Sequence, residues 1–168
     1  MSLADRLNEM DERAAIAALV RCCASPTWVA AMNAARPFVD DESVTTAAGE
    51  IWRRLGPADW LEAFAAHPKI GDIDSLRAKF AASRQWSSEE QAGVDHASEA
   101  TLRRLAELNG EYERKFGYIF IVCATGKTAD ELLAILAGRL PNDPAAELPI
   151  AAEEQLKITL VRLKKLDA

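Results

Sequence analysis

The 168-residue chain has the composition of an ordinary globular protein, with 49% hydrophobic residues, 27% charged residues and a formal net charge of −6. This acidic balance argues against nucleic acid as a partner, because a phosphate backbone selects basic surfaces. No apolar run approaches the roughly 20 residues of a membrane-spanning helix, and the N-terminus lacks the basic-then-apolar pattern of a signal peptide. We therefore expect one domain over residues 1–168, located in the cytoplasm, with neither nucleic acid nor membrane as a partner.

Hydrophobic spacing and capping residues predict a series of helices with short breaks. Asp11 is expected to cap a helix that runs through Cys23, and Ser25-Pro26 supplies the preferred cap and first-turn residues of the next helix. The expected helices span residues 11–23, 26–36, 41–55, 58–66, 74–82, 98–116, 128–139 and 145–166. The clearest is 98–116, where leucines recur at helical spacing and a glycine follows the last residue.

Residues 118–124 alone are typical of a strand, because they are β-branched and aromatic. A single strand would have no partner for its backbone groups. We therefore expect an all-α, single-domain bundle of about eight helices, with one extended or irregular buried segment near 118–124.

The three cysteines indicate no metal site. The number of cysteines is odd, and their positions lack the spacing of zinc ligands: they are Cys22, Cys23 and Cys123. We expect buried, reduced thiols.

His67, one of only two histidines, precedes Pro68 at the end of an expected helix. A proline pushes the preceding residue out of the helical region, so the His67 ring is expected on a turn. An imidazole there can give or take a proton at neutral pH. Alternatively, it simply interacts with the dipole of the helix that it ends.

Two interpretations also stay open for the polar segment 87–91, Ser-Ser-Glu-Glu-Gln. Its spacing fits a capping box, yet a helix N-terminus also offers N–H donors to an anionic or carbonyl ligand. Segment 118–124 is either core or a stretch of free backbone groups that could bind a planar heterocycle. Arg162 is either part of a surface ion pair or a bidentate partner for a carboxylate.

In order and spacing, these motifs resemble the family of 2-oxo-4-hydroxy-4-carboxy-5-ureidoimidazoline (OHCU) decarboxylases over essentially the whole chain. Thr27 departs from the family pattern as an insertion in its Ser-Pro-Trp element. The matching elements are Leu7-Asn8, residues 25–29, residues 36–38, residues 67–72, residues 87–91, residues 108–112, residues 115–123, Lys157-Ile158 and Arg162-Leu163.

The resemblance implies an all-α homodimeric carboxy-lyase that needs no metal or organic cofactor and converts OHCU to (S)-allantoin in urate degradation. It places the catalytic residues at His67 and Glu90. The implied substrate-binding residues are Pro68, Ser87, Gln91, Phe120, Ile121, Val122, Cys123, Ala124 and Arg162.

The main alternative is a non-catalytic helical interaction module, since each motif also accepts a structural role. A hydrolase is disfavoured, because the chain lacks both a cluster of metal ligands and a nucleophile–base pair.

Overall fold

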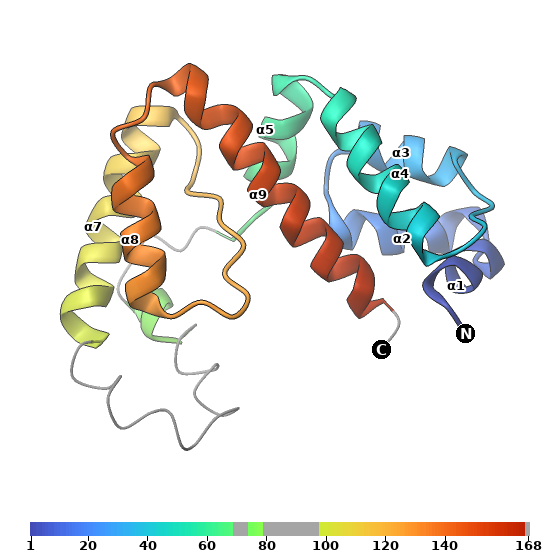
Figure 1. Ribbon diagram of the computed structural model, residues 1–168, viewed down its shortest axis with the longest axis horizontal. Coiled ribbons are helices and arrows are strands. Elements are labelled where there is room, and N and C mark those ends of the chain that lie inside the picture. Colours follow the sequence, from blue (N-terminus) through green and yellow to red (C-terminus); the bar gives the residue numbers. More distant parts are fainter. Residues whose placement is uncertain (69–73, 79–97, 167–168) are drawn as a thin grey trace. The chain divides into compact units, whose positions relative to one another are not determined.

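The computed structural model describes residues 1–68, 74–78 and 98–166, and all of their regular structure is helical (Figure 1). This confirms the expected all-α class. The helices are α1 (Leu3–Glu9), α2 (Glu12–Cys22), α3 (Pro26–Ala34), α4 (Asp41–Arg54), α5 (Pro57–Ala65), α7 (Ser98–Phe116), α8 (Ala129–Arg139) and α9 (Pro144–Lys165). Residues 74–78 form a further helical stretch. None of the described helices is both long and apolar enough to cross a membrane.

The chain divides into two compact units. Unit 1 comprises Met1–His67 and Leu148–Ala168, and unit 2 comprises Pro68–Glu147. The boundary falls inside α9, whose first residues belong to unit 2. The expectation of one domain over residues 1–168 stays a prediction.

Two buried tryptophans organise unit 1. The indole Nε1 of Trp28 in α3 donates to the main-chain oxygen of Ala48 in α4, at 3.1 Å. Trp52 in α4 donates in the same way to Ala152 in α9, at 2.8 Å. Both side chains are almost fully buried, so each large apolar ring is buried with its polar N–H satisfied. These contacts fix α4 against both α3 and the unit 1 part of α9.

In unit 2, α7 and α8 pack along the leucine stripe that the sequence indicates. The buried cluster contains Leu76, Leu102, Leu105, Leu108, Tyr112, Leu132 and Leu136. A capping box opens α8 as expected: Thr128 Oγ1 accepts from the N–H of Glu131 at 3.2 Å, and the Glu131 carboxylate accepts from the N–H of Thr128 at 2.9 Å.

The predicted bounds of the later helices agree with the structure to within one or two residues, except that the end predicted at residue 82 lies outside the described residues; α1 was not expected. It is a short helix with a capping box formed by Ser2 and Asp5. The three cysteines are buried and free, as predicted. Burial raises the pKa of the Cys22 thiol to about 11 and also raises that of Cys23.

Residues 119–124 have no regular secondary structure, which confirms an irregular segment in place of a strand. Only Ile121 and Cys123 are fully buried, whereas the other members are half-buried.

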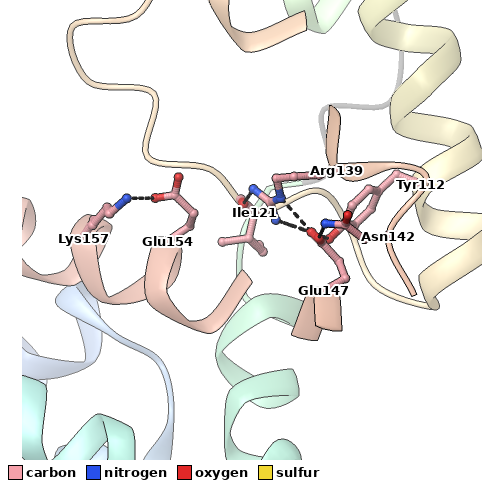
Figure 2. A network of polar contacts seen from close by, with 7 residues as sticks. All are labelled: Tyr112, Ile121, Arg139, Asn142, Glu147, Glu154 and Lys157. Carbon is pink, nitrogen blue, oxygen red and sulfur yellow. Dashed lines mark hydrogen bonds and ion pairs between the residues drawn. The ribbon is translucent and has the colours of Figure 1, made fainter. Parts of the chain in front are cut away.

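The carboxylate of Glu147, which is fully buried, organises the polar centre of unit 2 (Figure 2). It accepts from the Tyr112 hydroxyl at 2.6 Å, from Arg139 Nε at 2.7 Å and from Asn142 Nδ2 at 2.9 Å. Arg139 Nη1 donates in turn to the main-chain oxygen of Ile121, at 2.7 Å. Burial, followed by the hydrogen bond to Glu147, raises the pKa of Tyr112. The ion pair between Arg139 and Glu147 therefore anchors the irregular segment to α8 and to the start of α9.

We predict that breaking this ion pair strongly destabilises the protein. Removing one partner leaves the other charge buried and uncompensated, so Glu147→Gln and Arg139→Met should each lower the free energy of unfolding by about 3–5 kcal/mol. In the double variant the loss should be smaller than the sum of the single losses. Urea unfolding followed by circular dichroism measures all three.

The control is Glu153→Gln, which breaks the exposed pair between Arg53 Nε and Glu153 Oε1, 3.0 Å apart. It should cost far less, because solvent screens exposed pairs. Equal losses from the buried and exposed pairs would contradict the proposed role of Glu147.

Candidate functional site

His67 lies on the turn that follows α5, as the sequence predicts. Its main-chain N–H donates to the oxygen of Phe64 at 3.2 Å, and its side chain is half-buried. Pro68, the next residue, is exposed. The ring is thus neither fully buried in the core nor fully exposed on the outer face of a helix.

The His67 imidazole is held by a residue of α9 that the sequence analysis did not single out. His67 Nε2 lies 2.5 Å from Oε1 of Gln155, a short hydrogen bond. Gln155 is only 1% exposed. A signal for it existed, because a glutamine that lies one residue before Leu156 of the inner leucine stripe is expected to be buried and then needs a polar partner.

The hydrogen bonds of Thr159 indicate how the Gln155 amide is oriented. Thr159, one turn further along α9, donates its hydroxyl hydrogen to the main-chain oxygen of Gln155 at 3.0 Å. The hydroxyl oxygen is then left to accept from Gln155 Nε2, which lies 3.2 Å away. Gln155 therefore turns its nitrogen to Thr159 and its oxygen to His67.

Arg162 lies on the same face of α9 as Gln155 and Thr159, since the three follow helical spacing. Seven residues of helix place Arg162 about 10 Å along the axis from Gln155. Arg162 Nη1 is 3.5 Å from the main-chain oxygen of Cys22, the last residue of α2. A cation suits that position, because the end of a helix carries partial negative charge. His67 and Arg162 are thus both associated with one face of α9.

In unit 2, two cations hold carbonyl groups of the irregular segment. Arg139 binds the oxygen of Ile121, and Lys127 Nζ donates to the oxygen of Cys123 at 2.8 Å. The oxygen of Ala124 accepts from the N–H of Lys127 at 3.0 Å. Among the residues that the structure describes, the N–H groups of Phe120–Ala124 have no acceptor. Three carbonyl groups of the segment are therefore occupied, whereas no described residue accepts from the N–H groups of Phe120–Ala124.

Three of the predicted site residues, Ser87, Glu90 and Gln91, lie outside the described residues. Their places in the site stay predictions, as do the roles of the other predicted site residues in catalysis and substrate binding. No group of three or more His, Cys, Asp or Glu side chains arranged to hold a metal ion occurs in the described part of the chain.

The sequence is similar, over most of its length, to proteins named for urate degradation and for OHCU decarboxylation. It is 41% identical, over 86% of its length, to the uric acid degradation bifunctional protein TTL of Arabidopsis thaliana, but spans only 45% of that protein. It is 32% identical to the OHCU decarboxylase of Amia calva, over 83% of this chain and 79% of that one.

Matches to solved structures indicate the same family as the matches to sequence relatives. A crystal structure of OHCU decarboxylase in the presence of (S)-allantoin matches with a TM-score of 0.70 and 36% identity, covering 94% of this chain and 98% of the other. A structure of (S)-allantoin synthase matches with a TM-score of 0.71 over 98% of this chain and 54% of the other; at 23% identity it supports the fold alone. The family model for OHCU decarboxylase matches residues 8–164, which include most of both units. The chain therefore belongs to the OHCU decarboxylase family.

Proposed function

We propose that this protein is a carboxy-lyase that decarboxylates OHCU to (S)-allantoin in urate degradation. The observation that carries the proposal is the match, over nearly all of both chains, to an OHCU decarboxylase crystallised with (S)-allantoin. The alternative of a non-catalytic interaction module has no counterpart among the relatives described above.

The chemistry needs no external electron sink. When carbon dioxide leaves, the electron pair of the broken C–C bond passes into the conjugated C=N and C=O groups of the imidazoline ring. The protein then has to hold the departing carboxylate out of the ring plane, stabilise the enolate-like charge and deliver a proton to one face. We accordingly propose that the reaction uses neither a metal nor an organic cofactor.

We assign proton delivery to His67, as general acid toward the ring carbon after carbon dioxide has left. Its position supports this role, because the ring is fixed by Gln155 on a turn and remains half-buried. One-sided protonation accounts for a single enantiomer of the product. Glu90 is proposed to orient His67 or to bind the hydroxyl or ureido group of the substrate.

The remaining predicted residues are assigned to binding. The N–H groups of Phe120–Ala124, which have no acceptor within the described part of the chain, suit the ring oxygens, where each donor aimed at developing negative charge contributes about 3 kcal/mol. Gln91 is proposed to bind the ureido arm, with Ser87 and Pro68 alongside. Arg162 is proposed to attract the substrate carboxylate, because a guanidinium is the preferred partner of that group.

We also propose that the protein acts in the cytoplasm as a homodimer, as the family resemblance implies. Light scattering after size-exclusion chromatography should give twice the mass of the 18.3 kDa chain. A mass equal to that of one chain would contradict the dimer.

Replacement of His67 should abolish most of the activity without unfolding the protein. We expect His67→Asn to lower turnover by about 10²-fold or more, the usual scale for loss of a general acid. The assay supplies urate, urate oxidase and hydroxyisourate hydrolase, and follows the optical activity of the allantoin formed. His96→Asn removes the other histidine and serves as the control. Wild-type turnover in the His67 variant would exclude His67 from the chemistry.

A comparison of Glu89 with Glu90 distinguishes a catalytic role from a helix-capping role in segment 87–91. If Glu90 faces the substrate, Glu90→Ala should lower turnover by at least about tenfold more than Glu89→Ala, because only Glu90 would then touch the reacting groups. The same assay measures both variants, with thermal unfolding as a check on the fold. Equal losses would assign Glu90 a capping role.

A further inference from the structure

We propose that Gln155 is a positioning residue that fixes the orientation and the tautomer of the His67 imidazole. The inference rests on the proposed function, because it concerns the residue to which proton delivery is assigned. Two observations support it: the short contact between His67 Nε2 and Gln155 Oε1, and the burial of Gln155.

The direction of the hydrogen bond follows from Thr159. Its hydroxyl lies against the main-chain oxygen of Gln155 and the thiol of Cys23, and donation of its single hydrogen to either one leaves Thr159 as an acceptor toward the Gln155 side chain. The Gln155 amide must then present its nitrogen to Thr159 and its oxygen to His67. An amide oxygen only accepts, so His67 Nε2 carries a hydrogen.

The tautomer determines which proton moves. With Nε2–H committed to Gln155, the neutral ring has its lone pair on Nδ1, and the charged ring differs from it by one proton on Nδ1. The proton that His67 gives to the substrate carbon is therefore the one on Nδ1, and Nε2 keeps its hydrogen throughout. This is the usual arrangement of a working histidine, in which the partner of one nitrogen sets the chemistry of the other.

The buried surroundings make the restraint effective. Gln155 is 1% exposed and Thr159 is 2% exposed, so water cannot readily replace either hydrogen bond, and an unmade bond there is costly. Without the acceptor, the ring would lose the restraint that Gln155 places on its rotation and on the hydrogen at Nε2. A misplacement of about 1 Å in a reacting group can cost roughly 10²-fold in rate.

The test compares side chains of similar size with and without an acceptor. Gln155→Met removes the acceptor and should lower kcat by about 10- to 100-fold, with little change in KM, because Gln155 acts through His67 and not on the substrate. Gln155→Glu keeps an acceptor oxygen and should retain more kcat than Gln155→Met. Thr159→Val should lower kcat in the same direction, whereas Thr159→Ser keeps the hydroxyl and should restore it.

The control is Glu153→Gln on the exposed side of α9, and thermal unfolding checks the fold of each variant. Wild-type kcat in Gln155→Met, or a loss confined to KM, would overturn the inference. That failure is distinct from failure of the proposed function, in which the wild-type protein itself would not accelerate formation of (S)-allantoin.

Discussion

The hydrogen bond between His67 and Gln155 is the interaction on which the functional account depends. An imidazole can serve as a general acid only if its reacting nitrogen is aimed and its protonation is defined. The turn after α5 provides the position of the ring, but a turn alone leaves the side chain free to rotate. Gln155 supplies a restraint on the side chain, and Thr159 orients Gln155.

In unit 2, charged side chains hold the irregular segment in place. An irregular backbone inside a helical protein has polar groups that no helix satisfies. Here Arg139 and Lys127 bind carbonyl oxygens of the segment, and the buried carboxylate of Glu147 balances the charge of Arg139. No residue in the ranges that the structure describes accepts from the N–H groups of Phe120–Ala124, which leaves them as donors toward those ranges. A backbone held in this way can present several N–H groups to a flat, oxygen-rich ligand without reorganising when charge develops.

The sequence predicted the helices well wherever local chemistry determines them. The leucine stripe of α7 and the capping box of α8 are signals carried by neighbouring residues. Helix α1 was missed, because seven residues are too few to show a clear period. The turn at His67 was predicted because proline restricts the residue before it.

The supporting residues of the site could not be predicted in the same way. Gln155 and His67 are 88 residues apart, and Arg139 and Ile121 meet only after the chain has folded. Nor could the family motifs be sorted by role from sequence. The amide of Asn8, within one such motif, pairs with the main chain of Phe38 in another, at 2.8 Å for both bonds, and supports the fold of unit 1.

The role of Gln155 can be tested by measuring the tautomer of His67. Long-range ¹H–¹⁵N correlation spectra of the imidazoles identify which nitrogen carries hydrogen, and the chain has only two histidines to resolve. Comparison with His67→Asn assigns the signals. We predict that neutral His67 carries its hydrogen on Nε2 in the wild-type protein, and that the share of this tautomer falls in Gln155→Met. A wild-type ring protonated on Nδ1, with Nε2 bare, would contradict it.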